Sequence, residues 1–149
     1  MYFVDRTNIE NTLNYMESLF PLVKKLQQPK DQVEELALER VCYLFIESII
    51  DVGNNMIDGF IMRDPGSYAD IVDILMDEKV ISETDGESLK QILQSRKEII
   101  QTSGSINHQQ LAQLLHHQYE ALVAFPGAIR HYLTTELGPV SAFLPEQSE

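Results

Sequence analysis

Residues 31–62 read DQVEELALERVCYLFIESIIDVGNNMIDGFIM, and this stretch decides the fold class. Its apolar side chains recur at steps of three and four residues, the spacing of one face of an α-helix. They are Leu36, Val41, Leu44, Phe45, Ile49, Val52, Met56 and Phe60. Asp31 followed by Glu34 is typical of a helix start. The pattern predicts one helix of roughly thirty residues, about 45 Å long, whose length indicates a bundle spine or an oligomer interface.

The chain before this stretch carries the same helical spacing. Ile9, Leu13, Met16, Phe20 and Val23 recur at three-residue and four-residue steps. Thr7 and Glu10 have the spacing of a capping box, so we expect the first helix to begin there, with a kink at Pro21.

Three further helices are predicted after residue 62. Ser67 and Asp70 form a capping box ahead of a short helix through residues 71–79. A break at residues 81–89 leads into a fourth helix that ends near Gly104. Asn107 begins a fifth helix, which we expect to be interrupted at Pro126 and Gly127 and to end before Gly138.

No segment alternates apolar and polar residues with a period of two, and seven glycines are few for many tight hairpins. The predicted fold class is therefore all-α, an up-and-down bundle of four to five helices with one long second helix. We expect residues 1–137 to form a single helical domain and residues 138–149 to form a C-terminal tail.

Composition excludes several classes of protein. The chain has 149 residues, 44% of them hydrophobic, and a net charge of −12, which repels nucleic acid except at a local basic site. Its single cysteine, Cys42, allows no internal disulfide and no cysteine zinc site. The N-terminus does not have the layout of a signal peptide, and no apolar run is long enough to span a membrane. We therefore expect a cytoplasmic protein that has no membrane contact and needs no cofactor.

Residues 95–103, SRKEIIQTS, place Arg96, Lys97 and Gln101 along an apolar stripe. Arg96 can present a planar guanidinium to a phosphate. It can equally form an ion pair with Glu47 or Asp51 across the bundle, which is the commoner use of such an arginine. Spacing alone leaves both interpretations open.

The long helix also carries a polar stripe, in which Glu47, Asp51, Asn54 and Asp58 recur at helical steps. Two carboxylates one turn apart can bind a divalent ion or act as acid and base, but a polar dimer seam or salt bridges to Arg40 and Arg96 explain them as well. Gly53 lies in the same helix, and we expect a close approach there by another helix or by a neighbouring subunit. The four histidines do not have the spacing of a helical zinc site, so no metal site is predicted.

Four segments in this order resemble the HepT-like branch of the HEPN superfamily. They are VDRTNIENTLNYME (4–17), LALERVCYLFIESIIDVGNNMI (36–57), RDPGSYADIVDILMDEKVI (63–81) and SRKEIIQTS (95–103), and the resemblance spans residues 3 to about 135. It implies a helical homodimer joined through the long helices. In active members it implies a metal-independent ribonuclease toxin that is paired with a minimal nucleotidyltransferase antitoxin.

The active motif of this family is an arginine, usually followed by asparagine, with a histidine a few residues later and a tyrosine two positions beyond it. Mapped onto this chain, the resemblance places Arg96 at the arginine, but Lys97 at the asparagine, Gln101 at the histidine and Ser103 at the tyrosine that the antitoxin modifies. Glutamine does not exchange a proton near neutral pH, so the proton-transfer group is missing. His108 lies twelve residues beyond Arg96, after a predicted break, and is not expected to replace it.

The resemblance leads to three interpretations. The first is a homodimer that has lost full nuclease activity and binds a nucleotide, an RNA or a protein partner through Arg96, Lys97, Gln101, Glu47, Asp51 and Asn54. The second is an active ribonuclease toxin that uses Arg96 to stabilise the charge of the transition state. The third is a dimeric scaffold with no catalytic role.

Overall fold

The helix predicted at residues 31–62 is α2 (Gln32–Gly59) in the computed structural model, which describes residues 3–138. The Asp31 side chain caps it by accepting a hydrogen bond from the Glu34 N–H at 2.9 Å, and the Glu34 carboxylate accepts from the Lys30 N–H at 2.9 Å. These reciprocal bonds satisfy amide groups that have no partner inside the helix. The helix ends shortly before Ile61, which has a left-handed φ of 55°. The start is as predicted, and the end comes three residues early.

The described residues form seven helices and no strand, so the predicted all-α class is confirmed. The other six are α1 (Arg6–Lys25), α3 (Tyr68–Asp77), α4 (Glu83–Leu93), α5 (Arg96–Ile99), α6 (His108–His117) and α7 (Tyr119–Leu137). There are more helices than the predicted four to five because two predicted helices are each divided.

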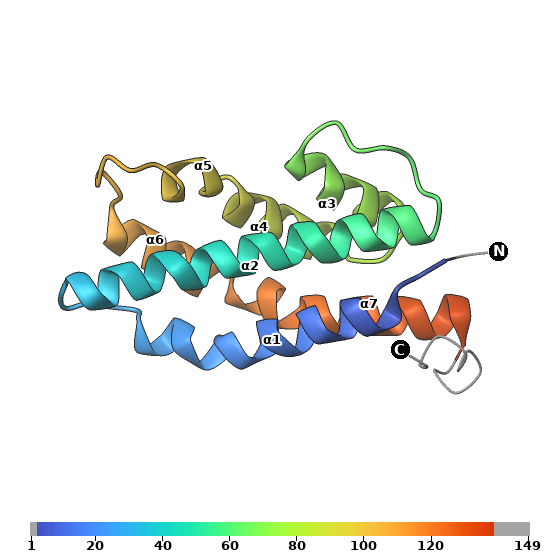
Figure 1. The fold of residues 1–149 in the computed structure, drawn as a ribbon, viewed down its shortest axis with the longest axis horizontal. Coiled ribbons are helices and arrows are strands. Elements are labelled where there is room, and N and C mark those ends of the chain that lie inside the picture. Colours follow the sequence, from blue (N-terminus) through green and yellow to red (C-terminus); the bar gives the residue numbers. More distant parts are fainter. Residues whose placement is uncertain (1–2, 139–149) are drawn as a thin grey trace.

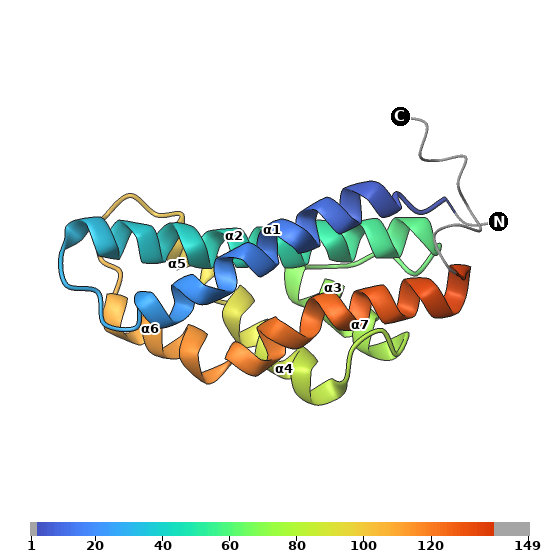
Figure 2. The ribbon, with the colours of Figure 1, turned by 90° about the horizontal axis from the view of Figure 1, so that it is seen from below.

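Helix α2 is the spine of the bundle. It runs the length of the molecule, with α1 and α7 along one side and α3, α4 and α5 along the other (Figure 1). Seen from below, α1 crosses close to α2, and α7 lies on the other side of α1 (Figure 2). The largest fully buried side chains come from α1, α2, α3 and α7 and belong to one continuous core: Phe45, Phe125, Ile9, Leu13, Met16, Leu38, Ile46, Ile49, Met56, Ile57, Ile74 and Leu75. No helix within residues 3–138 has the length and hydropathy needed to cross a bilayer.

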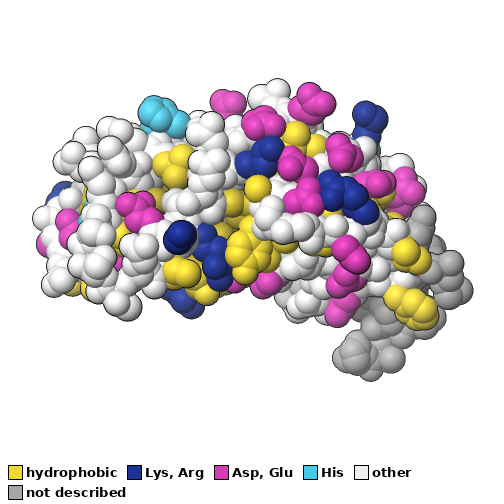
Figure 3. Space-filling model, turned by 90° about the horizontal axis from the view of Figure 1, so that it is seen from above, with side chains coloured by type: hydrophobic (Ala, Val, Ile, Leu, Met, Phe, Trp, Pro, Cys, Tyr) yellow, Lys and Arg dark blue, Asp and Glu magenta, His cyan; other side chains and the backbone are white. Residues whose placement is uncertain are grey.

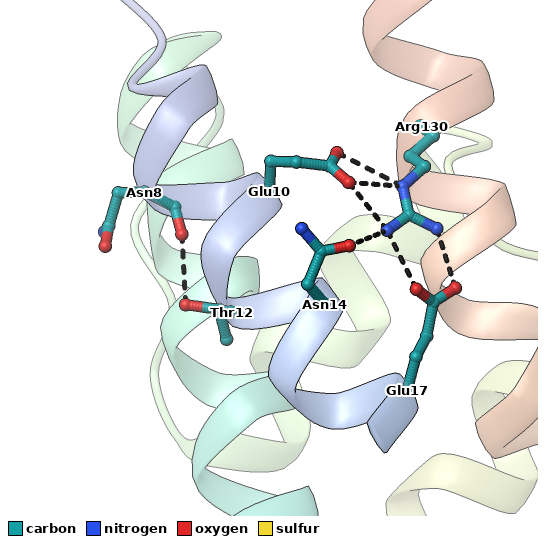
Figure 4. A network of polar contacts seen from close by, with 6 residues as sticks. All are labelled: Asn8, Glu10, Thr12, Asn14, Glu17 and Arg130. Carbon is teal, nitrogen blue, oxygen red and sulfur yellow. Dashed lines mark hydrogen bonds and ion pairs between the residues drawn. The ribbon is translucent and has the colours of Figure 1, made fainter. Parts of the chain in front are cut away.

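Helix α1 begins at a different cap from the predicted one. Asp5, not Thr7, accepts the capping hydrogen bond, from the Asn8 N–H at 3.0 Å. Glu10 does not fold back onto the helix start, because its carboxylate binds Arg130 on α7 at 2.7 Å (Figure 4). Glu17 binds the same guanidinium at 2.7 Å. The predicted capping box was therefore wrong, since a charged partner on another helix outcompetes a local amide for Glu10.

The predicted fourth helix is divided at Ser95, which was not expected. The Ser95 hydroxyl donates to the Ile92 carbonyl at 2.7 Å, and its N–H donates to the same carbonyl at 3.1 Å, three residues back instead of four. A serine hydroxyl that bonds to the preceding turn competes with the helical pattern and tightens it. Helix α4 therefore ends at Leu93, and α5 is a separate single turn that ends well before Gly104.

The predicted fifth helix is also divided, but at Gln118 and not at Pro126. The Asn107 cap is as predicted, accepting from the Gln110 N–H at 3.1 Å. Pro126 lies inside α7 and is buried beside Phe125 in the core, so packing offsets the hydrogen bond that proline cannot donate. Pro21 likewise lies inside α1. The predicted tail lies, from residue 139 onward, outside the described residues.

Candidate functional site

Seven side chains of α2 form a partly exposed outer stripe along the helix: Val33, Leu36, Arg40, Tyr43, Glu47, Asp51 and Asn54. Successive members are three or four residues apart, so they fall within roughly 80° of the helix circumference. The predicted polar residues Glu47, Asp51 and Asn54 share this stripe with exposed apolar ones. Helices α3 and α5 pack beside α2 and add their own side chains to its edge.

Arg96 is brought to this stripe by the break at Ser95, because it is the first residue of the short helix α5. Its Nε donates to Glu47 Oε2 at 2.8 Å, and its guanidinium lies 4.8 Å from the centre of the Tyr68 ring. The hydrogen bond to Glu47 raises the pKa of Arg96, which stays cationic. Within residues 3–138 its two Nη groups have no hydrogen-bond partner. These donors are free to bind an anion.

Asp51 and Asn54 continue the site along α2. Asp51 does not pair with Arg96, and its pKa is raised by partial burial and by the nearby charge of Glu47. Asn54 lines a hollow of about 420 Å³ together with Pro65, Gly66, Ser67, Tyr68 and Ile71. The hollow adjoins the Tyr68 ring on which Arg96 stacks.

Within the described part of the chain, the remaining predicted site residues form no hydrogen bond or ion pair with Arg96 or its partners. Lys97 is exposed on α5, beside Arg96 in sequence. Gln101 and Ser103 lie beyond the end of α5 and are exposed, and the Ser103 hydroxyl lies 2.9 Å from that of Ser105. The predicted fourth helix would have carried Gln101 together with Arg96, and that prediction was wrong because α5 ends before Gln101.

His108 begins α6, as the sequence predicts, and is held by the start of α2. Its Nε2 lies 2.6 Å from Glu39 Oε2, and its Nδ1 lies 3.8 Å from Glu35 Oε1. The exposed His116 and His117 do not join it. Among the described residues, no three His, Cys, Asp or Glu side chains are placed to share a metal ion. The Glu47 and Asp51 pair therefore has no third ligand of these kinds.

Two tyrosines belong to this surface but were not predicted as site residues. Tyr68 lies under Arg96, and Tyr43 lies under Arg40, with 5.5 Å between its ring centre and the Arg40 guanidinium. Tyr43 could have been found from its place on the outer stripe, one turn before Glu47. Tyr68 could not, because its contact depends on how α3 and α5 fold onto α2.

Gly53 marks a close approach, and of the two predicted neighbours the observed one is another helix of the same chain, α3. A Cβ added at Gly53 would overlap Cγ2 of Ile71 on α3. The close contact thus places α3, and with it Tyr68, against the outer stripe. A neighbouring subunit is not needed to explain this glycine.

The arrangement as a whole presents two arginines, each lying over one tyrosine ring, on an acidic protein. Basic and hydrophobic side chains gather near the middle of one edge of this face, and acidic side chains crowd the part beside it (Figure 3). A guanidinium stacked on an aromatic ring is suited to bind phosphate while a base stacks nearby. None of the residues gathered around Arg96 is a histidine.

Comparison with known proteins shows which family and which solved structures the chain is similar to. Residues 9–129 match the family described as Ribonuclease HepT-like. The candidate RNase YutE of Bacillus subtilis (strain 168) is 50% identical over 143 residues, which are 96% of this chain and 99% of that protein. The solved structure of YutE, described as a cytosolic protein of unknown function, matches with a TM-score of 0.88 over 95% of this chain and 99% of that one.

A more distant likeness is to a crystal structure of a toxin-antitoxin with AMP-PNP. It matches with a TM-score of 0.75 at 16% identity and covers 83% of this chain and 97% of that one. At this identity the likeness shows the fold alone.

Proposed function

This chain belongs to the HepT-like ribonuclease family, and from that premise we propose that it binds RNA at Arg96 without cleaving it efficiently. Arg96 carries the proposal, because it is cationic, is fixed by Glu47 and Tyr68, and keeps both Nη groups free. An arginine fork is well suited to the two oxygens of a phosphate. On a chain of net charge −12, such a local cation is what allows any contact with RNA.

The weak cleavage follows from the residues near Arg96. RNA cleavage needs a group that takes a proton from one oxygen and gives a proton to another, and an imidazole does this near neutral pH. Gln101 stands where the family has its histidine, and an amide does not titrate in that range. Losing a general acid or base lowers the rate by about 10² to 10⁴.

The alternative is an active metal-independent ribonuclease toxin, and one observation favours it. His108 is oriented by Glu39 at 2.6 Å, the kind of carboxylate partner that positions a catalytic imidazole. In this alternative His108 moves the proton while Arg96 stabilises the developing charge. It requires that His108→Ala abolish RNA cleavage, and a variant that cleaves as the wild type does would exclude this role.

The assembly we propose is a homodimer that shares a cleft between two copies of the outer stripe. Val33, 75% exposed, and Leu36, 56% exposed, supply apolar contact surface at one end of that stripe.

We further propose a minimal nucleotidyltransferase antitoxin as a partner, which the fold shared with a toxin-antitoxin protein supports. Since the relative YutE is described as cytosolic, we propose the same compartment for this chain.

The test is a fluorescence anisotropy titration of a labelled single-stranded RNA octamer. We expect Arg96→Gln to weaken binding by about tenfold and to lower the salt slope by about one, as the loss of one phosphate contact does. Arg63→Gln is the matched control, because Arg63 lies beyond the end of α2, is exposed, and forms an ion pair with Asp70. It should bind as the wild type does.

A second variant separates ligand binding from a structural role of the same pair. Glu47→Gln keeps a side-chain oxygen that can accept from Arg96 Nε but removes a negative charge that repels phosphate, so RNA should bind as tightly as before or more tightly. If Arg96→Gln and Glu47→Gln weaken binding equally, or if Arg96→Gln has no effect, Arg96 is not the phosphate contact.

A further inference from the structure

A second hollow of about 350 Å³ lies between α2 and the end of α5 and takes no part in the phosphate contact proposed above. Its lining comes from the outer stripe of α2 (Leu36, Arg40 and Tyr43), from the neighbouring residue Glu39 of the same helix, and from the end of α5 (Ile99 and Ile100). Its volume falls within the range of sites that take small organic ligands. Ile100 is 50% exposed although it is apolar, so the hollow presents uncovered apolar surface.

The hollow and Arg96 are close enough to bind one nucleotide. Tyr43 lies one turn before Glu47, the partner of Arg96, a step of about 6 Å along the helix. Tyr43 also lies near enough to Arg96 to act on its charge. Ile99 ends the same short helix that Arg96 begins. A phosphate on Arg96 therefore leaves the attached sugar and base within reach of the hollow.

The lining favours a flat aromatic ligand whose edge carries both hydrogen-bond donors and hydrogen-bond acceptors. The Tyr43 ring and the apolar side chains of Leu36 and Ile100 can cover the faces of a base, and such stacking tolerates any base. Glu39 and Arg40 are neighbours in sequence, both line the hollow, and they differ in hydrogen-bonding character. Glu39 offers carboxylate oxygens, which accept hydrogen bonds, and Arg40 offers guanidinium N–H groups, which donate them.

Glu39 is held in place for this role by His108. The Nε2 atom of His108 lies 2.6 Å from one carboxylate oxygen, Oε2. Within residues 3–138 the second oxygen, Oε1, has no hydrogen-bond partner. A carboxylate fixed at one oxygen and open at the other can select a donor on a ligand.

We propose that this hollow is a guanine subsite, in which Arg40 and Glu39 read the base of the nucleotide whose phosphate binds Arg96. Guanine offers O6 and N7 as acceptors, which match an arginine fork, and its N1–H and N2–H₂ donors match a carboxylate. Adenine places an amino donor where guanine has O6, so it would leave Arg40 facing another donor. The inference rests on the proposed RNA binding and adds a base preference to it.

The experiment compares two labelled uridine octamers that differ at one central position, which carries guanosine in one and adenosine in the other. We expect the wild type to bind the guanosine octamer at least about fivefold more tightly, since one bidentate contact discriminates by that much or more. Glu39→Gln keeps a hydrogen bond to His108 but replaces a carboxylate, which only accepts, with an amide that has one acceptor and one donor group. The preference for the guanosine octamer should then fall below about twofold. Arg96→Gln should weaken both octamers and leave their ratio unchanged.

Two matched controls accompany these variants. Tyr43→Leu should weaken both octamers by about fivefold or more because the stacking ring is lost, whereas Tyr15→Leu, at an exposed tyrosine on α1, should not. Glu87→Gln changes an exposed carboxylate on α4 and should keep the guanosine preference. Equal thermal midpoints for all variants exclude an effect through unfolding.

The outcomes separate the subsite from the proposed function. If both octamers bind equally through Arg96, or if Glu39→Gln keeps the preference, the subsite is wrong and the RNA-binding function stands. If neither octamer binds in an Arg96-dependent manner, the proposed function fails and the subsite fails with it. If Tyr43→Leu changes the mass of the protein in solution but not its RNA affinity, the hollow is a protein interface and the guanine subsite is excluded.

Discussion

Gly53 and Gly86 are two residues at which a helix packs closely against a neighbouring side chain. A Cβ at Gly53 would overlap Ile71 Cγ2, and a Cβ at Gly86 would overlap Sδ and Cγ of Met76. Ile71 is buried and β-branched, so it has few other conformations, whereas Met76 is unbranched and half-buried.

We predict that Gly53→Ala lowers the free energy of unfolding by about 1 to 3 kcal/mol, because the overlap with Ile71 outweighs the gain of about 1 kcal/mol in helix propensity. Gly86→Ala should cost less, since Met76 can move aside. Thermal unfolding of both variants measures this. A midpoint for Gly53→Ala at or above that of Gly86→Ala would contradict the prediction.

At the scale of single residues, the sequence predicts which kinds of side chain form a pair better than it predicts which helices dock against each other. The pairing of Arg96 with a carboxylate of the long helix follows from charge and spacing, and Glu47 is one of the two partners named in advance. The contact of Tyr68 with Arg96 depends on how α3 and α5 dock, and that of Glu39 with His108 depends on how α2 and α6 dock. Nothing in the local sequence specifies such a contact.

At the scale of elements, Arg130 joins α7 to α1 through Glu10, Asn14 and Glu17 (Figure 4). The hydrogen bond from Arg130 lowers the pKa of Glu17 below its ordinary value of 4.5. A carboxylate with a lowered folded-state pKa stabilises the fold above its unfolded pKa. That contribution is lost as the pH falls through the folded value.

We predict that Arg130→Gln lowers the free energy of unfolding by about 1 kcal/mol at neutral pH, the upper end for a partly exposed ion pair. The difference from the wild type should shrink as the pH falls below 4.5, because the wild type loses the same interaction. Urea unfolding across that range measures it. Lys24→Gln, an exposed change on α1, should show no such trend, and a pH-independent difference for Arg130→Gln would contradict the account.

Helix starts were predicted better than helix breaks. The caps Asp31, Ser67 and Asn107 were named from the sequence, because an N-cap needs only one side chain and one nearby amide. The breaks at Ser95 and Gln118 were missed. The break at Ser95 arises from a hydroxyl that bonds to the preceding turn, whereas a serine inside a helix can also point to solvent. The break at Gln118 has neither glycine nor proline at that position to indicate it. Pro126 was misleading because core packing overrode its local preference.

At the scale of the whole molecule, the fold class and the family could be predicted because they depend on the order and spacing of entire segments.

The proposed homodimer belongs to this scale as well. We predict that light scattering gives a mass twice the 17.0 kDa of one chain. Val33→Glu, on the outer stripe, should lower that mass toward the monomer, whereas Val123→Glu, an exposed valine on α7, should not. A wild-type monomer, or an equal effect of both variants, would contradict the proposed seam.

The central claim is that Arg96 still binds RNA although the proton-transfer residue is absent. The most direct measurement follows one labelled RNA octamer with excess protein and a metal chelator, recording binding by anisotropy and cleavage by gel. The account predicts binding that Arg96→Gln weakens about tenfold, with the octamer left intact over the time in which an active family member would cut it. Rapid cleavage by the wild type that disappears in an identically purified Arg96→Gln protein would contradict it.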